Sequence, residues 1–417
     1  MNDKKGKSVK KYCGRNATLK IKLLSLFVVA IISIFSLNEV FAMDSIKKEL
    51  YTKYSFKRMP NFVVPRSFGA TATVLQDGNV LFTGGFVSRL NSTNSTEVYS
   101  PIKNKFLKLP NMNDSRAFHS AILLSNGDVL ITGGERFERG KGSFPLKSAE
   151  IYKTKENKFI QISNMNEEMS NHKMYLLPNN NVVVIKNPNK IELFDVKTNT
   201  FKKIEGISYD NILTSYEFIE LCKDKILMYP YNYIYRKTPI ILLDLTDLSL
   251  KEININPFLQ MKYNPILSNN TIEQLKNGRE NYNIAKISDS EILVTGGKGG
   301  NLNGCRSARI ININTLIEKT TPDMPRPGKF FHSSISILNN NVLILGGQAG
   351  SDFSLQTLNS SLIYIYAQNE FLKFKNMIYK RSSPSFVMLN NGNYIIWGGS
   401  NVMGNPYPPE MLVVKNK

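Results

Sequence analysis

The sequence lacks the short motifs that mark most well-known catalytic and cofactor sites. It has no phosphate-cradling glycine loop followed by Lys and a helix, no nucleophile elbow, no Cys-x-x-Cys pair and no EF-hand loop. Its 417 residues include only three cysteines and three histidines. We therefore predict no catalytic residues, no metal site and no cofactor.

Acidic residues are in the minority. The chain has 53 lysines and arginines against 33 aspartates and glutamates, a formal net charge of +20. A balance this basic is compatible with binding to nucleic acid or to an anionic membrane. However, eight of the basic residues fall within residues 1–42, and the others are scattered rather than grouped. We therefore predict no specific nucleic-acid partner.

No apolar run is long enough to cross a membrane comfortably. The run Leu23–Phe35 follows a lysine-rich N-terminus and precedes the small-residue sequence Val40–Ala42. This order is typical of a secretory signal peptide, whereas a membrane span needs about 20 apolar residues. Residues 1–42 are predicted to be a signal peptide or, if uncleaved, an N-terminal anchor. We predict association with a membrane only if this segment is uncleaved. The remainder is predicted to be exported, to a periplasm, the cell surface or the medium.

The sequence does contain one motif that occurs in five copies, each ending in a Gly-Gly pair. It reads "LSNGDVLITGG" at Leu124–Gly134. The other copies are "LQDGNVLFTGG" at Leu75–Gly85, "ISDSEILVTGG" at Ile287–Gly297, "ILNNNVLILGG" at Ile337–Gly347 and "LNNGNYIIWGG" at Leu389–Gly399. Two degenerate copies, at Leu177–Asn187 and Leu221–Pro230, fill the gap in the series. Seven units result, about 50 residues apart, which is the period of a propeller-forming repeat.

Each unit predicts four short strands. In the second unit, His119–Leu124 is an apolar first strand, and Asn126-Gly127 is a turn of the kind that closes a two-residue hairpin. The second strand, Val129–Thr132, is apolar at nearly every position, as expected for a strand buried on both faces. The Gly-Gly pair ends it, where we expect neighbouring backbones to crowd or φ to turn positive. A variable loop and two more strands follow, the third at Ala149–Lys153 and the fourth opening at Phe159.

These units resemble kelch repeats. The stretch Ser115–Phe159 matches the bacterial form of the repeat nearly throughout, from its Arg-aromatic-His start to its Glu-apolar-Tyr third strand. The resemblance covers about residues 51–417 and implies an all-β, seven-bladed kelch β-propeller. We assign this domain to residues 43–417, with an insertion at about 256–279 that fits no blade. The last unit supplies only three strands, and Phe56–Phe62 matches the fourth-strand sequence Phe106–Met112. We therefore predict that the N-terminal strand closes the last blade.

Basic residues recur just before the first strands, at positions that we expect to form a ring around one mouth of the propeller channel. The same face carries the loops after the Gly-Gly pairs, where further arginines lie. Arginine forks suit carboxylates and phosphates. The residues predicted to bind a ligand are Arg66 (offset by one residue), Arg116, Arg136, Arg139, Arg279, Lys329 and Arg381. The alternative is structural, with these side chains tying loops to neighbouring blades through backbone carbonyls.

The three histidines, His119, His172 and His332, occupy one repeat position at the start of a first strand. That pattern favours a structural role. Galactose oxidase, a copper enzyme on a kelch propeller, needs two His, two Tyr and a Cys crosslinked to a Tyr. We find no matching constellation in the sequence.

Kelch propellers serve many functions, so the fold alone does not select one. We predict an exported, bacterial, monomeric scaffold that binds a protein, or an acidic glycan or peptide, without catalysis. The predicted binding surface is the face that bears the Gly-Gly loops, because variable loops on a rigid frame usually carry binding. The alternative is a carbohydrate-active enzyme working in the central funnel, similar to the periplasmic sialic-acid epimerase or to galactose oxidase.

Overall fold

The computed structural model describes residues 45–88, 91–204, 216–230, 239–253, 281–298, 304–350, 354–399 and 407–415. The chain divides into two units. The described part of the first is residues 45–55, helical over 45–53, together with 414–415. The second, residues 56–413, contains the repeats. The predicted signal peptide and the predicted insertion at 256–279 both lie outside the described residues. No helix among the described residues is long and apolar enough to cross a membrane.

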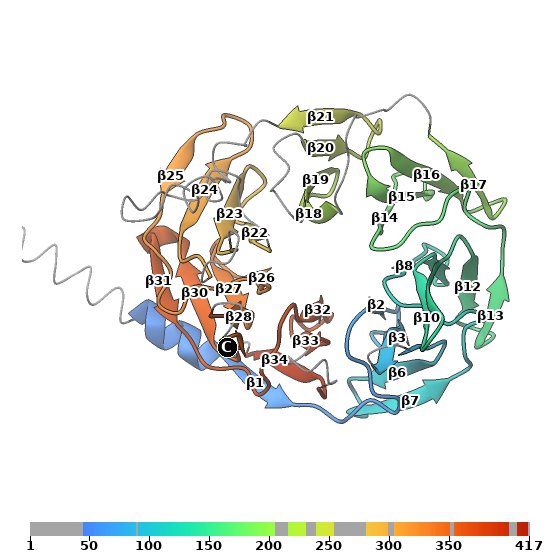
Figure 1. The fold of residues 1–417 in the computed structure, drawn as a ribbon, viewed down its shortest axis with the longest axis horizontal. Coiled ribbons are helices and arrows are strands. Elements are labelled where there is room, and N and C mark those ends of the chain that lie inside the picture. The colour runs from blue at the N-terminus through green and yellow to red at the C-terminus, as the bar shows by residue number, and fades with distance from the viewer. Residues whose placement is uncertain are drawn as a thin grey trace, which may run out of the picture. The chain divides into compact units, whose positions relative to one another are not determined.

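Seven four-stranded sheets succeed one another around a common centre in the second unit (Figure 1). We number these sheets as blades 1 to 7. Blade 1 consists of β2 (Ala70–Val74), β3 (Val80–Gly84), β6 (Thr96–Ser100) and β7 (Lys105–Leu109); blade 2 of β8 (Ser120–Leu123), β9 (Val129–Thr132), β12 (Ala149–Lys153) and β13 (Lys158–Gln161); and blade 3 of β14 (Lys173–Leu176), β15 (Val182–Asn187), β16 (Lys190–Asp195) and β17 (Thr200–Lys203). Blade 4 consists of β18 (Tyr216–Cys222), β19 (Lys225–Pro230), β20 (Ile240–Asp244) and β21 (Leu250–Ile253), and blade 5 of β22 (Asn283–Lys286), β23 (Glu291–Thr295), β24 (Ala308–Asn312) and β25 (Glu318–Thr320). Blade 6 consists of β26 (Ser333–Ser336), β27 (Val342–Leu345), β30 (Ser361–Ile365) and β31 (Glu370–Lys373), and blade 7 of β32 (Ser385–Met388), β33 (Tyr394–Trp397), β34 (Glu410–Val414) and β1 (Tyr54–Arg58).

Blade 7 is assembled from both ends of the repeat region. Its strand order is β1-β34-β33-β32, so a strand from before the first repeat completes the blade that the last repeat leaves one strand short. The all-β, seven-bladed fold and the closure by the N-terminal strand are thus confirmed. A closed ring of this kind leaves only short, protected strand edges.

Three two-stranded hairpins follow the Gly-Gly pairs of blades 1, 2 and 6. They are β4 (Phe86–Ser88) with β5 (Asn91–Ser92), β10 (Glu135–Glu138) with β11 (Gly142–Pro145), and β28 (Gln348–Ala349) with β29 (Gln356–Thr357). One short 3-10 helix, η1 (Tyr366–Gln368), joins the last two strands of blade 6. We call the end of the blades that carries these hairpins the Gly-Gly face.

The apolar second strands lie at the core, as their sequences predict. All residues of β3, β9, β23 and β27 are buried. Apolar clusters fill the spaces between successive blades. Between blades 1 and 2, for example, Leu81 packs with Val129, Ile131 and Tyr152. The blades therefore hold one another in place chiefly by burying the two faces of their inner strands.

The Gly-Gly pairs mark the junctions between blades, and both expected reasons for glycine hold. Gly133 has a φ of 55°, and a Cβ there would lie 2.3 Å from the backbone oxygen of Met169 in the approach to blade 3. The next residue, Gly134, has a φ of 89° and donates its N–H to that same oxygen at 2.8 Å. Glycine is thus required both by a left-handed backbone and by close approach of the next blade.

Each histidine connects its blade to the blade before it. The Nε2 atoms of the three histidines lie 2.7–2.8 Å from the hydroxyl of the threonine that precedes the Gly-Gly pair of the preceding blade. The pairs are Thr83 with His119, Thr132 with His172, and Thr295 with His332. The three Thr-Gly-Gly sequences of the chain are the three that a histidine follows. This junction role accounts for the repeat position of the histidines.

Candidate functional site

A cavity of about 720 Å³ is enclosed by the ring of blades, and all seven blades contribute to its lining. Gln348 and Gly399 belong to that lining, and both lie at or directly after a Gly-Gly pair. The cavity therefore lies toward the Gly-Gly face. Its size falls within the range of about 300–1,000 Å³ that is usual for sites that bind small molecules.

Among the described residues, the residue just before the first strand has a left-handed backbone in six blades, with φ between 49° and 73°. We call these residues the left-handed ring. They are Gly69, Phe118, Asn171, Asn281, Phe331 and Ser383, and all six line the cavity. For residues other than glycine this conformation costs roughly 1–2 kcal/mol, and asparagine tolerates it better than a bulky side chain does. Two phenylalanines at such positions are therefore unusual.

Backbone hydrogen bonds join the left-handed ring from blade to blade. The N–H of Phe118 donates to the carbonyl of Gly69 at 2.8 Å, and the N–H of Asn171 donates to the carbonyl of Phe118 at 2.9 Å. In the same way Phe331 donates to Asn281 at 3.1 Å, and Ser383 donates to Phe331 at 2.6 Å. These bonds need no particular side chain. The main chain therefore fixes the ring, while the chemistry of the side chains that face the cavity is free to differ.

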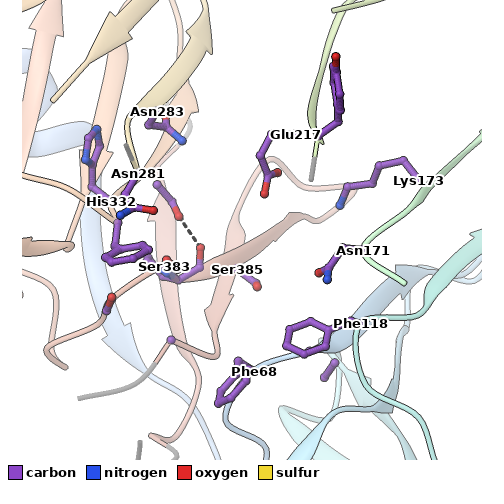
Figure 2. A pocket seen from close by; sticks show the side chains of 18 of the residues that line it. Phe68, Phe118, Asn171, Lys173, Glu217, Asn281, Asn283, His332, Ser383 and Ser385 are labelled. Atoms are coloured by element: carbon purple, nitrogen blue, oxygen red, sulfur yellow. Dashed lines mark hydrogen bonds between the residues drawn. The ribbon is translucent and has the colours of Figure 1, made fainter. Parts of the chain in front are cut away.

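An aromatic wall lies on the side of blades 1 and 2. The rings of Phe68 and Phe118 lie 5.7 Å apart, and both are partly exposed at the cavity (Figure 2). Behind them, the buried ring of Phe86 lies 4.5 Å from Phe68 and 4.7 Å from Phe137 of the β10–β11 hairpin. This packing explains how Phe118 is held in its strained conformation, because such strain persists only where the surroundings fix it.

Two opposite charges extend into the cavity from neighbouring blades. Lys173 opens β14 and Glu217 lies in β18, and Figure 2 shows both side chains directed inward. Within the described part of the chain, neither the side chain of Lys173 nor that of Glu217 makes a hydrogen bond or a close ion pair. Both are accessible from the cavity. The surrounding protein raises the pKa of Glu217 by desolvation, and the positive charge of Lys173 partly offsets that rise.

Amide and hydroxyl groups line the side of blades 5 to 7. Asn281 and Asn283 come from blade 5, and Ser383 and Ser385 come from blade 7 (Figure 2). The side-chain oxygen of Asn283 is buried and has no hydrogen-bond partner among the described residues. Buried polar atoms are normally paired, so this unpaired acceptor is an exception.

Three of the predicted ligand-binding residues are buried inside their own blades. Arg66, Arg116 and Arg381 have no exposed surface. Each guanidinium contacts a third-strand glutamate at 2.8–2.9 Å, and Nη1 of each donates to the carbonyl of the first glycine of the pair at 2.6 Å. The contacts join Arg66 to Glu97 and Gly84, Arg116 to Glu150 and Gly133, and Arg381 to Glu410 and Gly398. These groups form no ring at the channel mouth, and their contacts fit the structural alternative.

Lys329 takes the same place in blade 6, where Leu362 pairs across the sheet at the position of the glutamates. Its Nζ donates to the carbonyls of Gly346 at 3.0 Å and Ser360 at 3.1 Å. Burial lowers the pKa of Lys329 to about 7, since no carboxylate opposes the desolvation. Lys329 is buried and therefore does not face a ligand either.

The other predicted basic residues have different surroundings. Arg136 and Arg139 lie on the β10–β11 hairpin at the Gly-Gly face, where Arg139 is exposed and the side chain of Arg136 is 42% exposed. The guanidinium of Arg136 lies 5.4 Å from the ring of Phe144 and 3.2 Å from Glu138. A ligand can reach both arginines, so their role in binding stays a prediction. Arg279 lies outside the described residues.

Each of the three histidines is engaged in a blade junction. Their Nε2 atoms are bonded to threonine hydroxyls in three separate junctions. Burial lowers the pKa of His172 and His332 to about 3 and keeps both rings neutral. Among the residues that the structure describes, no three His, Cys, Asp or Glu side chains gather in a way that could hold a metal.

The residues that shape the cavity were missed by sequence reasoning, which looked for charge rather than for position. Phe118 is the aromatic of the Arg-aromatic-His start of its repeat, and Asn171 and Phe331 occupy the equivalent place in blades 3 and 6. In these three blades the chemistry of the position changes while the histidine after it recurs, and this is the signal that was available. Lys173 and Glu217 carried no comparable signal.

The comparisons with known proteins agree with this architecture. The kelch motif matches residues 69–113. No match to a curated protein sequence was found. Among solved structures, a fungal alcohol oxidase of the AA5 family, in complex with copper, superposes with a TM-score of 0.62 at 13% identity, covering 86% of this chain and 76% of that one. At that identity the likeness concerns the fold alone. The motif, the seven repeats and the seven blades together make this chain a kelch-repeat β-propeller.

Proposed function

We propose that this chain is an exported, non-catalytic binding protein that takes a protein or glycan ligand on its Gly-Gly face, with the central cavity as the seat of the ligand. The left-handed ring is the observation that carries the proposal. Glycine at Gly69 meets the backbone requirement without strain, yet Phe118 and Phe331 occupy equivalent positions at the cost of a left-handed conformation. Strain of this kind tends to gather at functional sites, and here it faces a cavity of suitable size.

The β10–β11 hairpin supports a ligand that extends beyond the cavity. All four residues of β11 are exposed, including the aromatic ring of Phe144. Arg136, beside that ring, and Arg139, at the hairpin turn, add two cations. Aromatic and arginine side chains together are typical of binding surfaces.

A pull-down with matched variants tests this proposal. The tagged protein is incubated with envelope fractions and culture medium, and so are two variants. The first combines Arg136→Glu with Arg139→Glu at the Gly-Gly face, and the second is Lys223→Glu, which changes an exposed lysine in the β18–β19 turn at the other end of a blade. We expect the native protein and Lys223→Glu to capture the same ligand, and the double variant to capture much less. Equal capture by all three proteins, or none, contradicts binding at this face.

Export is tested separately. Cell fractionation shows the compartment of the native chain, and sequencing of its mature N-terminus shows whether cleavage follows Ala42. We expect the protein outside the cytoplasm with the leader removed. An intact N-terminus in the membrane fraction supports the anchor instead, and a cytoplasmic location contradicts export.

A second candidate function is a sugar-active enzyme in the cavity, favoured by Glu217. A carboxyl group whose pKa is raised by enclosure in a cleft is a candidate general acid or base. The test is turnover of galactose and of sialic acid by the native protein and by Glu217→Gln. Turnover that is lost in Glu217→Gln supports the enzyme and contradicts a purely binding role.

A further inference from the structure

We infer that the cavity binds the neutral end of a saccharide chain, and that the side chains of the left-handed ring are its contact residues. This inference rests on the proposed function, because it names the ligand of the same site. It differs from the sequence-based prediction of an acidic ligand. That prediction depended in part on Arg66, Arg116 and Arg381, which the structure buries against glutamates.

In the left-handed ring the backbone supports the fold, and the side chains are left to contact a ligand. Main-chain hydrogen bonds link the ring residues of successive blades, and Gly69 shows that the position needs no side chain for the fold. The side chains found there nevertheless include two phenylalanines, two asparagines and one serine. Asparagine tolerates the left-handed region better than phenylalanine does, so a phenylalanine at this position calls for a reason other than local stability. Contact with a ligand supplies that reason.

The aromatic wall suits the apolar face of a pyranose ring. Phe68 and Phe118 present partly exposed rings to the cavity, and Phe86 and Phe137 hold them rigidly from behind. The C–H groups on one face of a sugar carry small positive partial charges, and an aromatic face is negative, so the two attract while both lose water. A rigid ring makes this contact at little cost in side-chain entropy.

The opposite wall suits sugar hydroxyls. A side-chain amide presents a donor and an acceptor side by side, which matches a pair of neighbouring hydroxyls. Asn281 and Asn283 bring two amides to this wall and Ser385 adds a hydroxyl, while Asn171 brings a third amide from blade 3, beside Phe118.

The charges of the described lining indicate a neutral ligand. Lys173 and Glu217 bring one cation and one carboxyl group, and low pKa values keep the histidines behind the wall uncharged. The cation can donate to a hydroxyl and the carboxylate can accept from one, so a polyhydroxylated ligand uses both. An anionic sugar gains from Lys173 but is opposed by Glu217, and a cationic ligand meets the reverse.

The experiment uses the mature, full-length protein and saturation-transfer NMR. The probes are the methyl glycosides of galactose, glucose, mannose and N-acetylglucosamine, with glucuronic acid and N-acetylneuraminic acid as anionic counterparts. Titration calorimetry then gives the affinity of the strongest probe. We expect at least one neutral glycoside to receive saturation more strongly than either acid.

Glycine substitutions in the ring separate binding from folding. Asn171→Gly removes an exposed amide from a residue with φ 54° without straining the backbone. Phe118→Gly introduces the residue that blade 1 has at the equivalent position, Gly69. The matched control is Asn340→Gly, an exposed asparagine with φ 59° in the β26–β27 turn at the other end of blade 6. We expect Asn171→Gly and Phe118→Gly each to weaken glycoside binding, by a factor of up to about ten. That is the loss in affinity that follows from removing one hydrogen bond or ring contact. Asn340→Gly should bind like the native protein, and Asn171→Gly should melt at or above the native temperature.

The possible failures are distinguishable. Preference for either acid overturns the neutral ligand, and glycoside binding that survives both ring substitutions overturns the assignment of the contact residues. If no probe binds, while the pull-down captures a protein through Arg136 and Arg139, the saccharide inference is wrong and the proposed function stands. If neither experiment gives binding, both are wrong.

Discussion

The Nε2 atom of His332 lies 2.8 Å from the hydroxyl oxygen of Thr295, and this contact joins blade 6 to blade 5. Burial lowers the pKa of His332 to about 3, against an ordinary value near 6.5, and the nearby positive charge of Lys329 adds to this effect. The folded state therefore holds a neutral ring at pH values where the unfolded chain takes up a proton. His172, in the equivalent contact with Thr132, has the same lowered pKa.

We predict that these histidines make the propeller sensitive to acid. Between about pH 6.5 and 3 the unfolded state binds more protons than the folded state, so the stability is full above pH 6.5 and falls as the pH drops through this range. Each histidine contributes a slope of up to about 1.4 kcal/mol per pH unit. Urea unfolding of the native protein and of His332→Gln at pH 7, 6, 5 and 4 measures it. The variant should be less stable at pH 7 but should lose less on acidification; parallel pH profiles would sink this assignment.

Arg116 and Glu150 provide the second prediction, a test of structural against ligand-binding roles. Arg116→Met leaves the carboxylate of Glu150 buried without its partner, and such a change costs about 3–5 kcal/mol. The double variant Arg116→Met with Glu150→Leu removes both charges and should recover part of that loss. Denaturant unfolding of the single and double variants measures the effect. Normal stability together with lost ligand capture in Arg116→Met would instead assign Arg116 to the binding surface.

The frame of this protein was predictable because its signals are local. A hairpin turn such as Asn126-Gly127 and an apolar strand such as Val129–Thr132 depend on neighbours in sequence, and repetition shows which of them recur. The direction of Arg116 was not predictable in the same way. Its partner Glu150 lies in the third strand of the blade, 34 residues further along the chain. Proximity to the first strand therefore predicted a place at the channel mouth, whereas the ion pair directs the side chain into the blade.

The candidate site was less predictable, because the main feature of Phe118 is its backbone conformation. That conformation is set by hydrogen bonds to Gly69 in the preceding blade and to Asn171 in the following one. A sequence pattern gives the positions of these residues in the repeat but not the bonds between blades. Burial and backbone geometry, rather than charge, therefore define the site in the structure.

Lys329 gives the third prediction, which concerns stability at alkaline pH, whereas the histidines act at acid pH. Its pKa in the folded protein is lowered to about 7 by burial, and its ordinary value is 10.5. Between these values the unfolded chain holds a proton that the folded protein does not, so this group makes stability rise with pH from about 7 to 10.5. Unfolding measurements at pH 7 to 10 should show that rise in the native protein. It should be absent in Lys329→Met, and a rise of the same size in that variant contradicts the prediction.

A matched pair of glycines gives the last prediction, which concerns the blade junctions. Gly84 has a φ of 58°, and a Cβ there would lie 2.3 Å from the backbone oxygen of Arg116. Gly392, in the β32–β33 turn, has a φ of 80°, but a Cβ there meets nothing within 4 Å. Alanine at Gly392 therefore adds only the cost of a left-handed backbone, roughly 1–2 kcal/mol. Alanine at Gly84 adds the same cost and also pushes two blades apart, so we expect Gly84→Ala to lose at least about 1 kcal/mol more than Gly392→Ala. Thermal and urea unfolding of both variants measures the difference, and equal losses would show that the blades can separate at this junction without penalty.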